Sequence, residues 1–248
     1  MPRQRSDNRA FPLQGNSNFQ VICLEQGQRV SKSVRAELHE LQHAVLGQIY
    51  DEVYRRPLDP PPIVMLRLFE LVPTSRYDLQ EKEISSYENI EILGMLCAVE
   101  LVPNQVPTHG KGDMDANSPS TYHSPTPISS QGSSTSNDTS VSESEIARLT
   151  AEILIGSKVA QSSLIKIDGQ KSLLFVFPDL AVKNQGLFKL RYKFFDLFSA
   201  VPGRAINIES ECTGGAFCVY TSKDFPGLQK STELTKVCFH HKGHIYLS

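Results

Sequence analysis

The chain has 248 residues, 40% of them apolar and 21% charged, and carries a formal net charge of −2 at pH 7. This length and composition support a hydrophobic core in one large domain or two small ones, and they exclude a chain that is basic throughout. No apolar run reaches the length of a membrane span and none follows the charged N-terminus, so we expect a soluble, non-secreted protein with no membrane partner.

Four elements are expected in the first part of the chain, after a flexible N-terminus at residues 1–18. Phe19–Leu24 has the composition of a short strand, and Ile63–Leu71 that of a longer one. Between them an apolar stripe with spacings of three and four predicts an amphipathic helix from Ser33 to Tyr54, which would cover a sheet edge or bind a partner. Glu91–Val102 fits either helix or strand by pattern, and its short length and the proline after it favour a strand. The stripe of the expected helix consists of Val34, Leu38, Leu41, Val45, Ile49 and Val53.

A proline-rich loop, Arg55-Arg56-Pro57-Leu58-Asp59-Pro60-Pro61-Pro62, leads into the strand that begins at Ile63. Each proline fixes φ at about −65° and pushes the residue before it to extended geometry, so the loop has little freedom to move. Two arginines on this stiff support suit a phosphate partner, because a guanidinium donates two hydrogen bonds at once and keeps its charge. The alternative is a polyproline II connector whose arginines only solvate an edge.

Residues 103–145 are rich in Ser, Thr, Pro, Asn and Gly and contain few large apolar side chains. Such a segment buries too little surface to offset its conformational entropy, so we expect it to be disordered. It holds one lysine against five acidic residues, so the remainder of the chain is slightly basic. Local basic patches therefore say more about an anionic partner than the net charge does.

The part of the chain after this segment has mostly strand signals, at Leu173–Phe177, Leu187–Phe198 and Phe217–Thr221, with a turn or bulge at Gly214-Gly215. The long middle strand alternates between an apolar face and a basic one. Short strands separated by Gly, Pro and Asp, with few helices, predict a mainly β fold of the sandwich type. Residues 103–145 then form an insertion in one domain, because neither half alone supplies two sheets. The expected core residues of the middle strand are Phe188, Leu190, Tyr192 and Phe194, and its basic residues are Lys189, Arg191 and Lys193.

The sequence predicts neither a metal site nor an enzyme. Five cysteines without a CxxC pair favour buried free thiols over disulfides or zinc. His240, His241 and His244 lie close together, but neighbouring histidines on the terminal strand that we expect there would point to opposite faces. Neither a GxSxG motif nor a phosphate-cradling glycine loop occurs, and Asp179 and Asp196 fit roles in a turn and at a strand end. We expect no cofactor and no small-molecule substrate, and the absence of tryptophan disfavours a sandwich hydrolase or carbohydrate binder.

Three stretches in order resemble the velvet family of fungal regulators: RRPLDPPPIVMLRL at 55–68, LLFVFPDLAVKNQGLFKLRYKFFDL at 173–197 and CVYTSKDFPGLQKSTELTK at 218–236. The resemblance covers about residues 19–102 and 146–243, in a single domain at 19–248. It implies an immunoglobulin-like sandwich similar to the Rel-type DNA-binding domains, with one or two helices and the disordered insertion. It also implies a nuclear protein that shuttles with the cytoplasm and controls development, sporulation and secondary metabolism.

The resemblance further implies double-stranded DNA and other velvet proteins as partners, the latter in a homodimer or heterodimer. Arg55 and Arg56 match the end of the basic cluster that precedes the family's prolines, so they are the first candidates for DNA contact. Arg29 and Lys32 are further candidates upstream.

Two departures leave a second function open. The earlier basic positions of the cluster fall on Asp51 and Val53. Losing a cation and gaining an acid weakens non-specific affinity for DNA. The alternative is a velvet partner subunit that dimerises but binds DNA poorly alone.

On the long strand, Lys189, Arg191 and Lys193 extend the basic surface if their face is exposed, or else form an ordinary polar sheet face.

Overall fold

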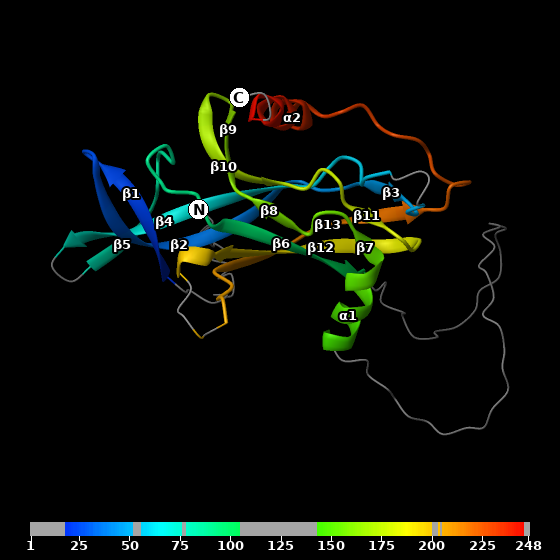
Figure 1. Ribbon diagram of the computed structural model, residues 1–248, viewed down its shortest axis with the longest axis horizontal. Helices are drawn as coiled ribbons and strands as arrows, with labels where there is room; N and C mark the ends of the chain where they lie inside the picture. Colours follow the sequence, from blue (N-terminus) through cyan, green and yellow to red (C-terminus); the bar gives the residue numbers. More distant parts are fainter. Residues whose placement is uncertain are drawn as a thin grey trace, which may run out of the picture.

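Two β-sheets packed face to face form the computed structural model, which describes residues 18–51, 56–75, 78–104, 143–199, 203 and 205–245 (Figure 1). The first sheet has the order β1 (Asn18–Glu25), β2 (Gln28–Gln42), β4 (Ile63–Ser75), β10 (Gln170–Val176) and β9 (Ser163–Ile167), with β5 (Asp78–Glu83) also paired to β4. The second sheet has the order β3 (Leu46–Gln48), β13 (Ser210–Tyr220), β12 (Gly186–Asp196), β6 (Met95–Pro103) and β8 (Val159–Gln161).

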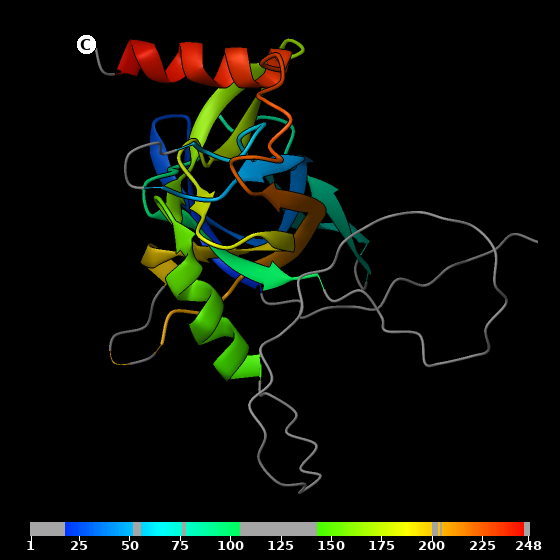
Figure 2. The same cartoon turned by 90° about the vertical axis from the view of Figure 1, so that its right-hand side faces the viewer.

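The remaining elements are short. A two-stranded sheet joins β7 (Leu154–Ile155) to β11 (Ala181–Val182), and a 3₁₀ turn, η1 (Leu197–Ser199), follows β12. Helix α1 (Glu143–Ile153) lies beside β6, and α2 (Glu233–Ile245) lies across the molecule next to β9, on the far side from α1 (Figure 2). No helix in the described ranges is both long and apolar enough to span a membrane. The mainly β architecture is confirmed, whereas the immunoglobulin-like topology stays a prediction.

Aromatic rings from both sheets meet in the core. Phe19 of β1 and Phe175 of β10 pack on Phe194 of β12, with ring centroids 5.6 and 6.0 Å apart, and Phe177 packs on Tyr192 at 5.8 Å. The expected core face of β12 is confirmed, because its alternate residues are buried there. Burial of such rings provides much of the stability of a sandwich of this size.

The prediction of a helix from Ser33 to Tyr54 is wrong, because residues 28–42 form strand β2. Its side chains alternate at period two, with Val34, Ala36 and Leu38 buried. Strands β1 and β4 pair with β2 on both sides and satisfy its backbone, which overrides a local helical pattern. The residues that completed the helical stripe serve other elements: Leu41 and Val45 are exposed, Ile49 is half-buried, and Val53 lies outside the described residues.

The glycine pair 214–215 forms the bulge that the sequence predicted. The pairing of β12 with β13 shifts register between Lys189 and Arg191, opposite these two glycines. The bulge makes room for Glu40 of β2, whose Oε2 accepts a hydrogen bond from the Gly215 amide at 2.6 Å. A Cβ atom at Gly214 would collide with the Glu40 carboxylate, so a larger residue there would displace this carboxylate from its position in the bulge.

The other strand predictions hold. The expected strands at 19–24, 63–71, 91–102, 173–177, 187–198 and 217–221 correspond to β1, β4, β6, β10, β12 and β13. The insertion expected at 103–145 and the N-terminal segment at 1–18 fall almost wholly outside the described residues.

The prediction of a terminal strand around His240, His241 and His244 is wrong, because residues 233–245 form helix α2. The helix begins after Thr232, whose Oγ1 accepts a hydrogen bond from the Thr235 amide at 3.0 Å, as an N-cap does. Leu234 and Cys238, four residues apart, pack on the outer face of the first sheet beside Ile63 and other apolar side chains. This tertiary contact selects the helix. His240 lies on α2, and the side chains of His241 and His244 are outside the described set.

The five cysteines are free thiols, as predicted. Cys23, Cys97 and Cys238 are buried, while Cys212 and Cys218 are half-buried. Burial raises the pKa of the Cys97 thiol, and burial together with the nearby Glu40 raises the pKa of Cys212 to about 12. The Cys97 and Cys212 thiols are therefore protonated at neutral pH.

Candidate nucleic-acid interface

The proline-rich loop is held in place by neighbours on both sides. The Leu58 amide donates to the Leu180 carbonyl at 2.7 Å, and the Asp59 amide donates to the Leu46 carbonyl at 2.9 Å. The Leu58 side chain is buried against Gly47, and the Asp59-Pro60 peptide bond is cis. The exposed Arg56 comes immediately before this fixed segment. Arg55, its partner in the sequence prediction, lies outside the described residues.

Phe225, in the segment that connects β13 to α2, lies beneath Arg56. The guanidinium carbon is 5.6 Å from the centre of the Phe225 ring, which is a cation–π arrangement. The same connection is tied to the proline-rich loop by the Gln229 amide, which donates to Asp59 Oδ2 at 2.7 Å. The ring restricts the guanidinium without using its hydrogen-bond donors. No described residue accepts a hydrogen bond from these donors, which suits them to a phosphate or a base edge.

These segments meet at one end of the sandwich. The Tyr50 amide donates to the Val182 carbonyl at 2.8 Å, which places Lys183 of the β11–β12 connection beside Tyr50, and the Leu58 amide of the proline-rich loop donates to Leu180 a few residues before Lys183. Strands β3 and β11 and the end of β13 lie together there, on the right of Figure 1 and facing the viewer in Figure 2. Loops at one end of a rigid sandwich are a common place for a binding surface.

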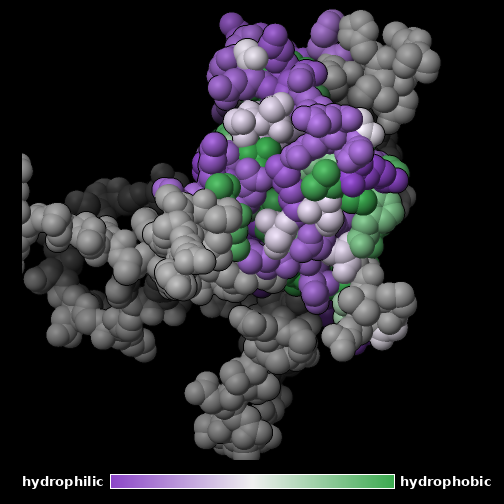
Figure 3. Space-filling view, turned by 90° about the vertical axis from the view of Figure 1, so that its left-hand side faces the viewer, coloured by the Kyte–Doolittle hydropathy of each residue, from purple (hydrophilic) through white to green (hydrophobic). Residues whose placement is uncertain are grey.

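Arg29 and Lys32 lie at the opposite end of β2. Arg29 pairs with Glu91, and Lys32 pairs with Glu25 at 2.7 Å and Glu70 at 3.1 Å. Hydrogen bonds to these two carboxylates raise the pKa of Lys32. At about 3.3 Å per strand residue, Arg29 is about 40 Å from the end of β2 nearest the proline-rich loop. The structure therefore does not bring these two predicted contacts together with Arg56. Figure 3 shows their end of the molecule, where hydrophilic residues predominate around small apolar areas.

The basic residues of β12 lie on the outer face of the second sheet and are partly paired. Lys193 Nζ lies 2.6 Å from Glu100 Oε1, and Arg191 Nε lies 3.7 Å from Glu211 Oε1. Lys189 is nearer the end of the sandwich that carries Arg56, because Gly186 at the start of β12 pairs with Val219. Of the three, Lys189 is the best placed to extend the basic surface.

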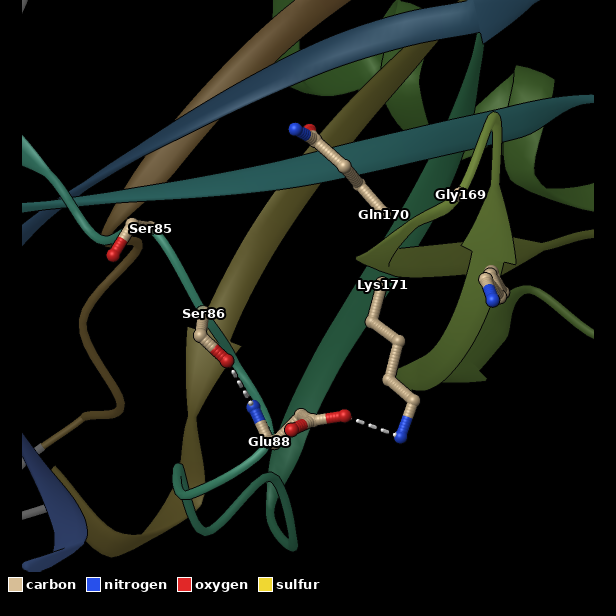
Figure 4. A pocket seen from close by; sticks show the side chains of 7 residues that line it. Ser85, Ser86, Glu88, Gly169, Gln170 and Lys171 are labelled. Carbon is tan, nitrogen blue, oxygen red and sulfur yellow. Dashed lines mark hydrogen bonds and ion pairs between the residues drawn. The ribbon is translucent and has the colours of Figure 1, made fainter.

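A polar pocket of about 280 Å³ lies at the turn between β9 and β10 (Figure 4). Lys171 Nζ is 2.6 Å from Glu88 Oε1, and the Glu88 amide donates to Ser86 Oγ at 3.5 Å. Lys166 lines the same pocket and stands directly opposite Lys171 in the strand register. Nothing in this lining pairs a nucleophile with a base, so the pocket does not suggest catalysis.

No cluster of three or more His, Cys, Asp or Glu suited to a metal occurs within the described ranges. The two aspartates have the structural roles that the sequence predicted. Asp179 accepts hydrogen bonds from the Ser157 amide at 3.1 and 3.2 Å. Asp196, buried at the end of β12, accepts one from the Phe198 amide at 3.1 Å, and burial raises the pKa of its carboxyl.

Sequence reasoning missed Phe225 as the partner of Arg56. Phe225 lies in the third stretch that resembles the velvet family, but nothing in its local pattern indicates a contact with a loop about 170 residues earlier. Only the course of the chain from β13 to α2 reveals it.

Comparison with known proteins gives a consistent picture. A family model described as "Velvet factor" matches residues 36–246. The chain is 43% identical over 211 residues to a probable velvet family sexual development regulator of Schizophyllum commune, with 85% of this chain and 71% of that protein covered. A protein of the same description from Laccaria bicolor is 38% identical over 240 residues, covering 85% and 69%. Velvet complex subunit 2 of Gibberella moniliformis is 35% identical over 91 residues, covering 34% and 20%.

Proposed function

Because this chain belongs to the velvet family, we propose that it is a nuclear transcriptional regulator of fungal development that binds double-stranded DNA as a homodimer or heterodimer. Two relatives described as sexual development regulators support the developmental role. Control of sporulation and secondary metabolism, and shuttling between nucleus and cytoplasm, are part of the same proposal. A family of regulators also fits a protein that is not an enzyme.

The observation that carries the proposal is the placement of Arg56. Arg56 is exposed, and its guanidinium lies over the Phe225 ring. It has no carboxylate partner among the described residues. A planar cation held this way makes two parallel hydrogen bonds to a backbone phosphate or to the O6 and N7 atoms of guanine. The prolines keep its position constant from one complex to the next.

A dimer doubles this charged footprint. Two copies related by a two-fold axis present two such arginine loops, which suits a site on DNA made of two halves. A second velvet protein in place of the second copy would present its own loop instead. The printed name of one relative, a velvet complex subunit, supports an assembly of this kind.

Asp51 favours a second candidate function, that of a partner subunit that dimerises but binds DNA poorly alone. Asp51 is exposed and lies five residues before Arg56 in the sequence. A negative charge there opposes the favourable electrostatics of phosphate binding. In that case another velvet protein supplies the missing cations.

Binding of the purified full chain to a pool of labelled duplex promoter fragments, measured by fluorescence anisotropy at several salt concentrations, tests the proposal. We expect DNA binding by the wild type to weaken as salt is added. In Arg56→Ala the affinity should be about tenfold lower, and the slope of log K against log salt should fall by about one, since one phosphate contact is lost. Arg29→Ala is the matched comparison, because this arginine is paired with Glu91 at the opposite end.

The outcomes separate the candidates. Loss of binding in Arg56→Ala but not in Arg29→Ala supports recognition through the proline-rich loop. Equal losses in both variants contradict that location. No binding by a folded wild type, restored when another velvet protein is added, establishes the partner-subunit function.

A further inference from the structure

Eight of the lysines and arginines on the described surface are paired with carboxylates. The pairs lie on the outer faces of both sheets and on α2: Arg29–Glu91, Lys32–Glu25, Lys32–Glu70, Arg35–Glu81, Arg67–Glu83, Lys171–Glu88, Arg191–Glu211, Lys193–Glu100 and Lys236–Glu233. A paired cation is a poor phosphate ligand, because its carboxylate must first be displaced. Cations without such a partner are therefore the better candidates for an anionic ligand.

Lys223 and Lys230 are exposed and have no carboxylate partner among the residues that the structure describes. Both lie in the connection from β13 to α2, the orange segment of Figure 1. Lys223 lies two residues before Phe225, the residue whose ring contacts Arg56. Lys230 comes directly after Gln229. The Gln229 amide donates to Asp59 in the proline-rich loop, so both lysines are held close to that loop.

Contacts at both ends fix this connection. At its start, Gln48 Nε2 donates to Ser222 Oγ at 2.8 Å, and the Thr221 hydroxyl donates to Asp224 Oδ2 at 2.5 Å. At its end, the Thr232 hydroxyl donates to the Gln42 amide oxygen at 2.5 Å. A segment tied at several points loses little conformational entropy when it binds, which favours a preorganised contact surface.

We propose that residues 221–230 form the second half of the DNA-contacting surface, in which Lys223 and Lys230 contact backbone phosphates and Phe225 positions the Arg56 guanidinium. This inference rests on the proposed function, because it takes the end of the sandwich that carries Arg56 as the DNA-binding end. It adds contacts from a part of the chain far from the proline-rich loop in sequence.

The charges of this end are consistent with a phosphate ligand. Among the described residues of this end, the cations Arg56, Lys183, Lys223 and Lys230 stand with the carboxylates of Asp51, Asp59 and Asp224. The Asp59 and Asp224 carboxylates accept hydrogen bonds from the Gln229 amide and the Thr221 hydroxyl, which occupy one oxygen of each. The lysine heads carry their charge on long flexible stems and reach outward to a phosphate.

The double variant Lys223→Ala/Lys230→Ala tests the phosphate contacts. We expect the slope of log K against log salt to fall by about two, with a loss of affinity that is similar for all duplex sequences, because phosphate contacts carry no sequence information. The matched control is Lys82→Ala/Lys166→Ala. It removes two exposed lysines that have no carboxylate partner within the described ranges, from β5 and β9.

Phe225→Leu tests the positioning role. Leucine keeps an apolar side chain but removes the ring face, so we expect DNA binding about two- to fivefold weaker with an unchanged salt slope. Phe225→Tyr keeps the ring face and should restore binding to the wild-type value. A purely structural role for Phe225 would instead lower the thermal midpoint of Phe225→Leu, which we expect to stay close to that of the wild type.

The results distinguish this inference from the proposal on which it rests. Binding that weakens in Arg56→Ala but is the same in Lys223→Ala/Lys230→Ala as in the control variant overturns the lysine contacts alone. Equal weakening in the two lysine variants also overturns them, because charge removal anywhere would then suffice. No DNA binding by a folded wild type overturns the inference together with the proposed function.

Discussion

Glu40 is a glutamate that points into the sandwich, an unusual place for an acidic side chain. Its Oε1 accepts a hydrogen bond from the Tyr192 hydroxyl at 2.7 Å, and its Oε2 accepts one from the Gly215 amide at 2.6 Å. These bonds join β2 of the first sheet to β12 and β13 of the second. Burial and the neighbouring carboxylate raise the pKa of Tyr192 well above its usual range, so its hydroxyl always has a proton to donate.

Replacing Tyr192 with phenylalanine should lower the free energy of unfolding by about 1–3 kcal/mol. The change keeps the ring but leaves Glu40 Oε1 without its donor, and an unsatisfied polar atom inside a protein has a cost of about this size. Urea denaturation followed by circular dichroism measures the loss.

Tyr50→Phe serves as the control for Tyr192→Phe. The Tyr50 hydroxyl has no hydrogen-bond partner in the described part of the chain, so its removal should change the free energy of unfolding by less than about 0.5 kcal/mol. Equal effects of the two substitutions would show that the Glu40 contact contributes nothing of its own.

At the scale of elements, one buried amide helps the apolar packing of Leu234 and Cys238 to attach α2 to the sandwich. Gln42, at the end of β2, donates from Nε2 to the Pro61 carbonyl at 2.7 Å and to Thr235 Oγ1 at 2.9 Å. Its Oε1 accepts from the Thr232 hydroxyl, which also caps the helix. The side chain therefore links a strand, the proline-rich loop and the first turn of α2.

Gln42→Leu should loosen α2 and expose Cys238. Leucine offers no hydrogen bond to Pro61, Thr232 or Thr235, so the first turn of the helix loses these attachments and the Cys238 thiol, which the helix packs against the sheet, becomes accessible more often. We expect Cys238 to react with a thiol reagent about tenfold faster, measured by peptide mass spectrometry, which corresponds to a loss of about 1.4 kcal/mol in local stability.

Two comparisons make the labelling result specific. Cys97, buried between the sheets, should keep its wild-type rate in Gln42→Leu, which excludes global unfolding. Gln20→Leu removes an exposed amide on β1 that bonds only to Ser31 within the described residues, and it should leave Cys238 protected. Unchanged labelling of Cys238 in Gln42→Leu would mean that apolar packing alone holds α2.

At the scale of the whole molecule, the outer face of the first sheet is tied together by ion pairs. Arg35 makes two hydrogen bonds of 2.9 Å to Glu81, and Arg67 Nε donates to Glu83 Oε1 at 2.8 Å. Both guanidinium groups lie over the Phe69 ring, at 4.5 and 5.0 Å. Hydrogen bonds from the two arginines lower the pKa of Glu81 and of Glu83.

These lowered pKa values predict a loss of stability in acid. The folded protein binds fewer protons at Glu81 and Glu83 than the unfolded chain does, so their contribution is complete above the ordinary carboxyl range and is lost as the pH falls through it. The pairs are partly exposed, and solvent screening limits each to less than about 1 kcal/mol. Urea midpoints measured from about pH 7 down to about pH 3 should show the decline.

Glu83→Gln should flatten this acid decline, because the variant has no carboxylate to protonate at that site. Glu233→Gln is the control, since Glu233 is highly exposed at the start of α2. Asp196 acts in the opposite direction: burial raises its pKa, so its contribution decreases as the pH rises above the ordinary carboxyl range. A decline as steep in Glu83→Gln as in the wild type would assign acid sensitivity to other groups.

Local patterns predicted the elements whose signals are strong and uninterrupted. The alternation in residues 187–198 identified both faces of β12, because period two has no other explanation over so long a run. The same rule failed for β2, where the inward-facing Ala36 is small, Glu40 is charged, and the exposed Leu41 and Val45 complete a helical stripe. The period-two pattern of the strand was present at Val34, Ala36 and Leu38. It was weaker than the helical pattern with spacings of three and four.

The sequence by itself determined the mainly β class, the position of most strands, the free thiols and membership of the velvet family, because each rests on composition, on short-range periodicity or on motifs read in order. Only the tertiary structure decided that residues 28–42 pair as a strand and 233–245 coil as a helix. It alone placed Phe225 under Arg56 and separated Arg29 and Lys32 from them. The reason is physical: contacts between segments far apart in the chain depend on the course of the backbone, and no local pattern encodes that course.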